Sequence, residues 1–357
     1  MTDQVFPSKP GWKALLAACV TDPIQLAERF GVNPDRLASA IRRFPMRINP
    51  YYFSLIRWPG DAIWRQAVPD PAELTDAAGT ADPLCEEEQS PVPGLIHRYP
   101  DRVVLLAADQ CAMFCRFCMR KRRVGGVAAE ERIAAGVDYI RSTKAVHEVI
   151  LSGGDPLMLD DSRLARLLES IRAIDHVRLV RIHSRMPCTL PQRITGDLAR
   201  MLRAFQPLYL ITHFNHPDEI TDRSREACAR LADAGIPLGC QTVLLKGVND
   251  EPAVMHHLME MLLVMRVRPY YLHQLDHVHG TGHFRVPLEK GLSIMQHLRG
   301  SLSGMGVPHY MVDLPGGGGK VPLTPDYVVS RDRSVWMLRN GEGRVFSYPV
   351  SDPPCPT

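Results

Sequence analysis

Residues 103–118 read Val103-Val-Leu-Leu-Ala-Ala-Asp-Gln-Cys111-Ala-Met-Phe-Cys115-Arg-Phe-Cys118. The continuous apolar run at 103–108 is typical of a strand that is buried on both faces of a parallel sheet. Three cysteines follow on the loop that leaves this strand, at the spacing C-x3-C-x2-C. Thiolates are soft ligands, which favour an iron–sulfur cluster or zinc over calcium or magnesium. The alternative is a set of three incidental buried cysteines.

The number of cysteines bears on which metal site is predicted. A structural zinc site takes four ligands, whereas a cluster held by three cysteines leaves one iron free for an outside ligand. Phe117 lies just before the last cysteine, where its ring could cover a cofactor.

The pattern of apolar runs predicts the fold class. Five further short runs follow the first, and helix-like stretches such as 161–174, 222–234 and 253–265 lie between them. Six strand–helix alternations predict an α/β fold with a parallel sheet, either a partial (β/α)6 TIM-like barrel or an open doubly wound sheet. The five later runs are Glu148–Ser152, Arg178–His183, Leu208–Thr212, Leu238–Leu244 and Pro269–Leu275.

Polar residues follow these predicted strands at one end. In both kinds of parallel fold, chemistry gathers at the carboxyl ends of the strands. We therefore expect one site there, made of Cys111, Gly153-Gly154-Asp155, His183-Ser184-Arg185, His213–His216, Gln241 and Asp276.

The rest of the chain is predicted to flank this core. Residues 11–45 have the spacing of short helices, with a helix start at Thr21-Asp22-Pro23. Residues 60–97 show little periodicity and predict an extended connector that packs on the domain. We expect an N-terminal helical region with its connector at 1–97, a partial-barrel core at 98–285 and a C-terminal lysine-bearing segment at 286–357.

Composition bounds the possible partners and location. The 357 residues carry 42 lysines and arginines against 39 acidic residues, a formal net charge of +3. This balance gives no argument for binding to nucleic acid or to a membrane surface. No apolar run approaches the ~18 residues of a spanning helix, and residues 1–12 lack the layout of a secretion signal. We expect a cytoplasmic protein whose cysteines bind metal rather than form disulfides.

A second unusual stretch is Leu314-Pro-Gly-Gly-Gly-Gly-Lys320. Four consecutive glycines cost backbone entropy, and they make sense where the backbone approaches a ligand closely or takes positive φ. Lys320 could be a solvated loop residue, a phosphate-binding charge or a lysine that forms a Schiff base with pyridoxal phosphate. The phosphate-binding P-loop pattern fails because Val321 follows the lysine.

Together these residues resemble the lysine 2,3-aminomutase family of radical S-adenosylmethionine enzymes. The resemblance runs from about Arg47 to about Tyr348. Its motifs are the cysteine triplet, Asn49-Pro-Tyr-Tyr52, Ser90-Pro-Val-Pro-Gly-Leu95, His97-Arg-Tyr-Pro-Asp-Arg102, Ser152-Gly-Gly-Asp155, Pro191-Gln-Arg-Ile-Thr195, Thr212-His-Phe-Asn-His-Pro217, Arg268-Pro-Tyr-Tyr271, His283-Phe-Arg285 and Gly316–Lys320.

The resemblance implies three cofactors. Cys111, Cys115 and Cys118 would bind a [4Fe-4S] cluster. Ser152, Gly153, Gly154 and Asp155, with Gln241 as a weaker candidate, would meet S-adenosyl-L-methionine. Lys320 would be the catalytic lysine that carries pyridoxal 5′-phosphate, and Arg102, Arg98 and Tyr99 would face its phosphate, which an arginine fork suits. The cysteines and Lys320 should then face a common cavity.

The resemblance also implies a substrate. Arg120 would pair with the carboxylate of L-lysine, or it could be part of a solvated basic run. Asp276 and Asp313 would hold the ε-ammonium group, or they could be ordinary surface aspartates. Two buried carboxylates favour a cationic side chain, because a wrong substrate leaves them unpaired. The expected reaction is 2,3-amino migration on lysine, an isomerase activity.

Several alternatives stay open. Arginine or another amino acid could be the substrate. The short tail is similar to the proteobacterial branch that supplies (R)-β-lysine for modification of elongation factor P. An unlike alternative is an iron–sulfur redox sensor. The partners expected for the enzyme are a small-molecule substrate and an external electron donor, with a possible homo-oligomer.

Overall fold

Nine strands hydrogen-bond side by side in their sequence order in the computed structural model, which describes residues 11–126 and 130–350. Strands β2 to β8 are parallel to one another, and an antiparallel partner closes each edge of the sheet, β1 beside β2 and β9 beside β8. Their bounds are β1 Leu95–Tyr99, β2 Arg102–Ala108, β3 Glu148–Gly153, β4 Leu179–His183, β5 Leu208–Thr212, β6 Leu238–Leu244, β7 Arg268–Gln274, β8 His309–Leu314 and β9 Gly319–Leu323.

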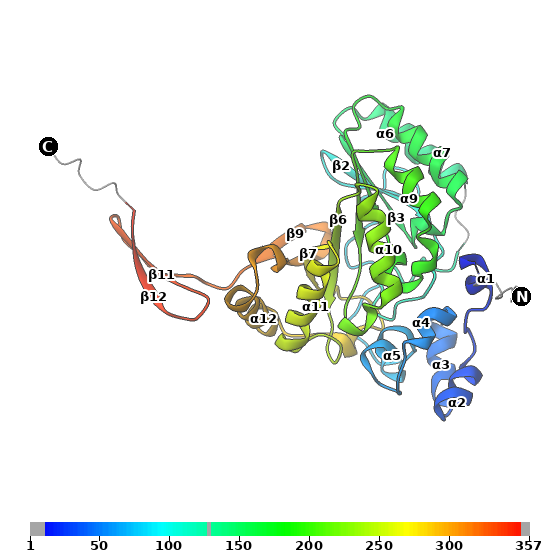
Figure 1. Ribbon diagram of the computed structural model, residues 1–357, viewed down its shortest axis with the longest axis horizontal. Helices are drawn as coiled ribbons and strands as arrows, with labels where there is room; N and C mark the ends of the chain where they lie inside the picture. Colours follow the sequence, from blue (N-terminus) through cyan, green and yellow to red (C-terminus); the bar gives the residue numbers. More distant parts are fainter. Residues whose placement is uncertain (1–10, 127–129, 351–357) are drawn as a thin grey trace, which may run out of the picture.

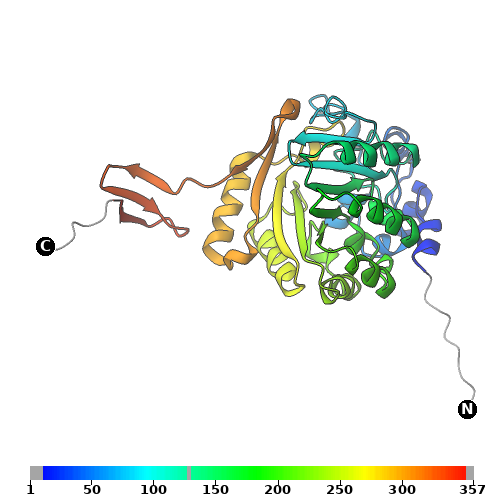
Figure 2. The same cartoon turned by 90° about the horizontal axis from the view of Figure 1, so that it is seen from above.

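The sheet curves into an open barrel with helices on its outer face, as Figure 2 shows. The α/β partial-barrel prediction is confirmed, and the six predicted strands correspond to β2 through β7. The sequence did not predict β8, which extends the parallel part of the sheet, or the edge strands. The outer helices are α6 Glu130–Ser142, α7 Asp161–Arg172, α9 Gly196–Arg203, α10 Asp222–Asp233, α11 Pro252–Val264 and α12 Leu288–Ser301 (Figure 1).

Helix α7 shows why these segments pack on the sheet. Leu164, Leu167, Leu168 and Ile171 recur at helical spacing and are all buried. A stripe of this kind needs an apolar surface to cover it. The strands supply that surface, since their own apolar runs face the helices as well as the barrel interior.

The N-terminal region consists of short helices, α1 Trp12–Ala17, α2 Pro23–Phe30, α3 Asp35–Arg43 and α4 Pro50–Ser54. The predicted helix start is confirmed, because the Asp22 carboxylate accepts a hydrogen bond from the Ile24 amide at 2.7 Å. The first ten residues, on which the expected lack of a secretion signal rests, lie outside the described residues.

The prediction of an extended connector at 60–97 was wrong in part. This stretch contains α5 Ala62–Ala67 and the 3-10 helix η1 Pro71–Leu74, and it ends in β1. Both helices are too short to produce a visible period in the sequence. Side-chain caps define them instead, since Asp61 accepts from the Trp64 amide and Asp70 forms a capping box with Glu73.

The connector is fastened to the cysteine loop by a buried ion-pair group. Glu73 contacts Arg116 at 2.6 Å and Lys121 at 3.0 Å, and its own side chain has no exposed surface. Arg116 lies between two of the cysteines, so these contacts fix the loop relative to the connector.

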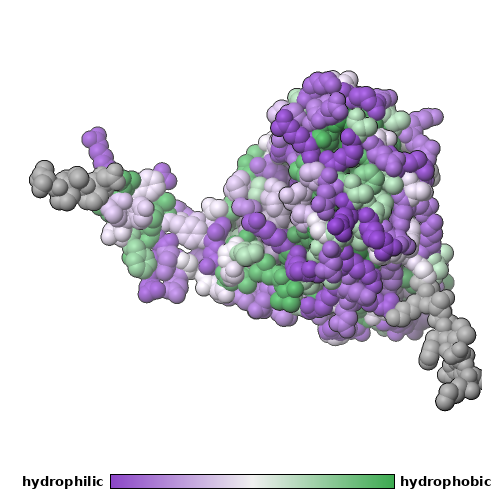
Figure 3. Space-filling model, turned by 45° about the horizontal axis from the view of Figure 1, so that its top comes forward, coloured by the Kyte–Doolittle hydropathy of each residue, from purple (hydrophilic) through white to green (hydrophobic). Residues whose placement is uncertain are grey.

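The C-terminal residues form a separate three-stranded antiparallel sheet, with β10 Val328–Arg331, β11 Val335–Arg339 and β12 Val345–Pro349. Figure 1 shows it projecting away from the barrel, and Figure 3 shows apolar side chains on its surface. Val345, Phe346 and Tyr348 are among these exposed residues. The predicted domain boundaries stay a prediction. Across the described ranges, no helix combines the length and the apolar character that a membrane crossing requires.

Candidate active site

A cavity of about 1130 Å³ lies inside the barrel and reaches the carboxyl ends of its strands. Every residue that the family resemblance assigned to a cofactor or to the substrate lines it, so the expected common cavity for the cysteines and Lys320 is present. These residues are Cys111, Cys115, Cys118, Phe117, Arg120, Ser152, Gly153, Gly154, Asp155, Gln241, Asp276, Asp313, Lys320, Arg98, Tyr99 and Arg102.

Two of the three cysteine sulfurs accept hydrogen bonds at the cavity wall. Arg185 donates from Nη1 to Cys115 Sγ at 2.8 Å, and the Arg120 amide donates to Cys118 Sγ at 3.3 Å. Donors directed at sulfur stabilise a metal-bound thiolate and tune cluster potential. The Phe117 ring lies tilted against the His213 ring, with 5.5 Å between their centroids.

The arrangement of these thiols fits a cluster. Within residues 11–126 and 130–350, no three His, Cys, Asp or Glu side chains gather around one point as ligands of a single ion would. A cluster places its cysteine ligands on different irons, and Cys111, Cys115 and Cys118 all line this cavity and can supply three such thiols.

Close backbone approach explains the two glycines after β3. Gly153 has φ +122°, and a Cβ there would lie 2.2 Å from the Ala108 carbonyl oxygen. At Gly154 a Cβ would lie 2.4 Å from the Gln110 carbonyl oxygen. Any side chain would push apart the ends of β2 and β3, which carry the cysteine loop and the glycine turn.

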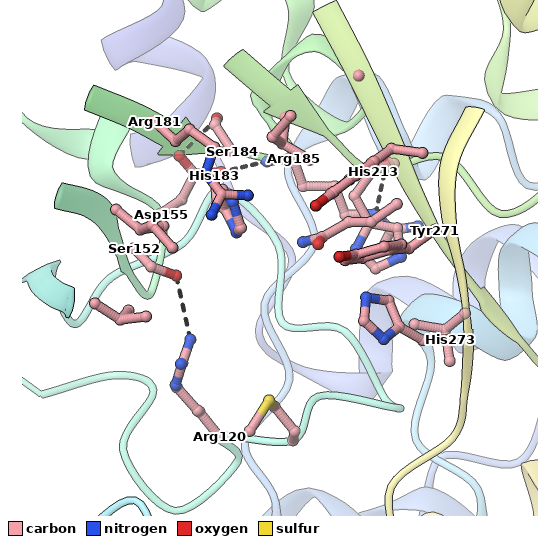
Figure 4. Close-up of a pocket in the computed structure, with 18 of the residues that line it drawn as sticks. Arg120, Ser152, Asp155, Arg181, His183, Ser184, Arg185, His213, Tyr271 and His273 are labelled. Carbon is pink, nitrogen blue, oxygen red and sulfur yellow. Dashed lines mark hydrogen bonds between the residues drawn. The ribbon is translucent and has the colours of Figure 1, made fainter. Parts of the chain in front are cut away.

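Asp155 is a buried structural carboxylate as well as a cavity residue. One oxygen accepts from Ser184 Oγ at 2.8 Å and the other from the Arg185 amide at 2.8 Å (Figure 4). Burial raises the pKa of Asp155 to about 6 despite these donors. The carboxylate thereby ties the loop after β3 to the loop after β4 and helps to aim Arg185 at the cluster site.

Lys320 lies in β9 directly opposite Asp313 in β8, and its ammonium group hydrogen-bonds to Asp313 Oδ2. The lysine is therefore in a strand edge rather than in the glycine loop itself. Its amide donates to the Tyr99 hydroxyl at 2.9 Å, and the Arg102 guanidinium lies 3.9 Å from the centre of the Tyr99 ring. These contacts bring Lys320 together with Tyr99 and Arg102, two of the three residues predicted to face the phosphate of the cofactor.

The two predicted aspartates are charged differently. Burial alone would raise the pKa of Asp313, but His273 and Lys320 outweigh it and lower this pKa to about 2. For Asp276, burial and then the negative charge of Asp313 raise the pKa to about 7. Asp313 is thus negatively charged near pH 7, whereas the full ionisation of Asp276 depends on a further cation beside it.

Arg120 already has a carboxylate partner, which sequence reasoning missed. Its Nε and Nη2 atoms contact the Glu86 oxygens at 2.6–3.1 Å, and its Nη1 donates to Ser152 Oγ at 3.2 Å (Figure 4). The Arg120 side chain is 15% exposed and that of Glu86 is 4% exposed. Arg120 is therefore not part of a solvated basic run, which was the alternative to a role in the site. Burial alone would raise the pKa of Glu86, but Arg120 lowers it.

The segment that carries Glu86 also contacts the opposite side of the site. Arg98 donates to the Leu84 carbonyl at 2.9 Å and to Gln89 at 2.7 Å, and the Gly316 amide donates to the Pro83 carbonyl at 3.4 Å. We call residues 82–90 the strap. It contacts Arg120 through Glu86 and the bend before β9 through the Pro83 carbonyl.

Three histidines complete the interior. His183, His213 and His273 come from β4, the end of β5 and β7 and line the cavity (Figure 4). Burial lowers the pKa of each of them, so all three are neutral near pH 7. Two of them were placed at strand ends by the sequence, whereas His273 was missed because it lies within an apolar run.

Comparisons with known proteins identify the family of this chain. The family model described as the radical SAM superfamily matches residues 107–259, and the model described as lysine-2,3-aminomutase matches residues 295–357. The L-lysine 2,3-aminomutase of Clostridium subterminale is 50% identical over 320 residues, covering 88% of this chain and 77% of that protein.

Two other relatives bear on the substrate. The L-lysine 2,3-aminomutase of Methanococcus maripaludis is 46% identical, over 94% of this chain and 81% of that protein. The glutamate 2,3-aminomutase of Clostridioides difficile is 44% identical, over 85% of this chain and 73% of that protein. With identity this high over most of both chains, the protein belongs to the lysine 2,3-aminomutase family of the radical S-adenosylmethionine superfamily.

Proposed function

We propose that this protein is an isomerase that moves the α-amino group of L-lysine to the β-carbon, using a [4Fe-4S] cluster, S-adenosyl-L-methionine and pyridoxal 5′-phosphate. The observation that carries the proposal is that Lys320 and the three cysteines line one cavity. When bound, the cluster and S-adenosylmethionine supply a 5′-deoxyadenosyl radical, and pyridoxal phosphate holds the migrating nitrogen.

The cysteines and the residues at the end of β3 have separate roles in this reaction. Cys111, Cys115 and Cys118 hold the cluster, and Arg185 supports Cys115 through its hydrogen bond. Ser152 and the backbone of Gly153 and Gly154, assisted by Gln241, bind S-adenosylmethionine. The Asp155 carboxylate is occupied by protein donors, so it contributes by holding this turn in place.

The other side of the cavity receives the second cofactor. Lys320 offers the amine, and Arg98 and Arg102 supply positive charge for a phosphate. Tyr99 fixes the Lys320 backbone through its hydroxyl and presents a ring on which Arg102 lies. Positioning of this kind supplies much of the catalysis when a reactive species must meet one carbon atom and water must be kept away.

The charges of the cavity favour lysine. Glu86 occupies the Nε–Nη2 edge of Arg120, which leaves Nη1, beside Ser152, for the substrate carboxylate. Asp276 and Asp313 hold the ε-ammonium group at the far end. The side chain of glutamate would bring a further negative charge beside Asp313 and no cation for Asp276, and this argues against the specificity named for the Clostridioides difficile relative.

The test is product analysis with anaerobic, reconstituted and reduced protein. Lysine, arginine and glutamate are supplied separately, each labelled at the α-nitrogen, and the position of the label is read by NMR. We expect β-lysine from lysine and no turnover of glutamate. A preference for arginine would keep the reaction and change the substrate. Turnover of glutamate would overturn the role of the two aspartates.

A control separates the two cofactor sites. Lys320→Ala should lose the yellow absorbance that pyridoxal phosphate gives with the wild type, while it keeps the brown absorbance of the cluster. Failure of the wild type to cleave S-adenosylmethionine would favour an iron–sulfur sensor instead. We further propose a cytoplasmic location and an external electron donor, which this radical chemistry requires.

A further inference from the structure

Arg185 is a buried arginine that contacts both a predicted cluster ligand and a buried carboxylate. Its Nη1 donates to Cys115 Sγ at 2.8 Å, and its Nη2 donates to Glu219 Oε1 at 2.7 Å and to Gln66 Oε1 at 2.6 Å. The Arg185 side chain is 9% exposed, and that of Glu219 has no exposed surface. The guanidinium therefore lies between a thiol and its own counter-ion, where water and salt screen neither charge well.

The donors around Glu219 indicate that this carboxyl group is ionised. Besides Arg185, the Tyr52 hydroxyl donates to Oε1 at 2.6 Å, and the amides of Asn215 and His216 donate to Oε2 at 2.6 Å and 3.1 Å. Three of these four donors, the guanidinium and the two amides, cannot accept a hydrogen bond. A carboxylate without a proton is the form that accepts from all of them.

Separate parts of the fold hold this group in place. Gln66 lies in α5, and Glu219 ends the 3-10 helix η4 Pro217–Glu219, which follows β5. Gln66 Oε1 also accepts from Asn215 Nδ2 at 3.0 Å, and the Gln66 carbonyl accepts from the Arg116 amide of the cysteine loop at 2.9 Å. The Arg185 guanidinium therefore cannot turn away from Cys115 without breaking buried hydrogen bonds on its other edge.

We propose that Glu219 is a positioning residue that sets the reduction potential of the cluster through Arg185. This inference rests on the [4Fe-4S] cluster of the proposed function and concerns the residues behind its ligands. Reduction transfers one electron from the external donor to the cluster and changes no bond, so the potential depends on nearby charges and on hydrogen bonds to sulfur. The positive charge of Arg185 faces Cys115 and favours the reduced cluster. The negative charge of Glu219 lies behind the guanidinium, opposes this effect and fixes the direction of the hydrogen bond.

The experiment is an anaerobic redox titration of the full chain with its reconstituted cluster, followed by the electron paramagnetic resonance signal of the reduced cluster. S-adenosylmethionine and pyridoxal phosphate are left out, so that only protein surrounds the cluster. The variants are Glu219→Gln, Arg185→Met and the double variant with both substitutions. The double variant removes both charges, so it leaves no buried charge uncompensated. Iron analysis verifies the cluster content of each protein.

Glu148→Gln is the matched control. Glu148 forms an ion pair with Arg181, which lies on the strand that leads to Arg185, and both side chains of this pair are mostly buried. However, Glu148 is the first residue of β3, whereas the cysteine loop and Arg185 lie at the carboxyl ends of the strands. The control therefore applies the same substitution to an arginine partner at the opposite end of the barrel.

We expect Glu219→Gln to make the midpoint potential less negative. The expected change in the ratio of reduced to oxidised cluster is about tenfold, which is about 59 mV for one electron. Arg185→Met should make the potential more negative. The double variant should lie between Arg185→Met and the wild type, because the positive charge that it loses is the nearer one. Glu148→Gln should leave the potential unchanged.

Two results would overturn the inference while the wild type still forms β-lysine. One is a Glu219→Gln potential equal to that of the wild type, and the other is an equal shift in Glu148→Gln. If Glu219→Gln holds no cluster, the double variant decides, since a potential equal to that of the wild type would also overturn the inference. A wild type that binds no cluster would overturn the proposed function itself, and this inference with it.

Discussion

Arg120 and Glu86 form a two-point ion pair in the cavity wall, with contacts of 2.6–3.1 Å between groups that are thirty-four positions apart in the chain. Removing one partner of a buried pair leaves the other charge uncompensated, at a cost of about 3–5 kcal/mol. We expect Glu86→Gln to lower the free energy of unfolding by an amount in this range, measured by urea denaturation under anaerobic conditions.

A neighbouring glutamate provides the control for this variant. Glu87 contacts Arg122 and Arg123 but is 62% exposed, and such surface pairs contribute about 0–1 kcal/mol. Glu87→Gln should therefore leave the urea midpoint almost unchanged. If both variants shifted it equally, burial would not be what gives the Glu86 pair its strength.

The Tyr99 hydroxyl is the acceptor for the Lys320 amide. Tyr99→Phe keeps the ring under Arg102 but leaves this amide without its partner, which costs about 1–3 kcal/mol where water cannot replace it. We expect a lower urea midpoint together with slower appearance of the yellow absorbance when pyridoxal phosphate is added.

Tyr327→Phe is the matched comparison for the Tyr99 variant. The Tyr327 hydroxyl is buried and has no hydrogen-bond partner among the described residues, so its removal should cost nothing or stabilise slightly. A loss equal to that of Tyr99→Phe would show that the hydroxyl–amide contact is not the cause.

The acidic pair gives the protein without substrate a characteristic dependence on pH. The pKa of Asp276 rises from 3.8 to about 7 on folding, so between these values the folded protein holds a proton that the unfolded chain has lost. Stability should therefore fall as pH rises through this interval. Asp276→Asn should flatten the plot of unfolding free energy against pH there, and an unchanged slope would show that Asp276 ionises freely.

Asp313 has the opposite dependence. Its pKa is lowered from 3.8 to about 2 in the folded protein, so its contribution is present above the unfolded value and is lost as pH falls toward 2. The two carboxylates can therefore be distinguished by the pH range in which each substitution changes stability.

The glycine turn after β3 should be intolerant of a side chain. Gly153→Ala places a Cβ 2.2 Å from the Ala108 carbonyl oxygen in addition to the strain of its positive φ. We expect loss of both S-adenosylmethionine binding and cluster content, read by equilibrium dialysis and iron analysis. Gly343→Ala, at φ +85° with open space around its Cβ, should cost only the conformational strain of about 1–2 kcal/mol. Retention of cluster and binding in Gly153→Ala would contradict the close-approach argument.

Local pattern was enough to predict the strands that are buried on both faces. Strands β2 and β3 are buried almost throughout, and β4 to β7 keep enough buried apolar residues between their cavity-facing ones to be recognised. In contrast, β8 reads His309-Tyr-Met-Val-Asp-Leu314, with polar residues that face the cavity, and its pattern resembles a loop. The polar residues that β8 places in the cavity, Asp313 among them, thus hide this strand from a search for apolar runs.

The partners of the charged residues could not be predicted in the same way. Arg120 was predicted to be a site residue through the family resemblance, but nothing local to either segment pairs it with Glu86. One signal was available, since the acidic run Glu86-Glu87-Glu88 complements the basic run Arg120–Arg123. Runs of opposite charge identify segments that can lie side by side, but only the folded structure shows which side chains form ion pairs.

The hairpin of β8 and β9 makes spacing along the chain part of the chemistry. Asp313 and Lys320 face the same side because an antiparallel register sets them opposite each other, with Pro315 and the glycines at 316–318 forming the bend between the strands. Side chains alternate between faces of a strand, so a slip of one residue would send the amine away from the barrel interior. Insertions or deletions in this bend should accordingly be more harmful than substitutions, because they change which residue of β9 lies opposite Asp313.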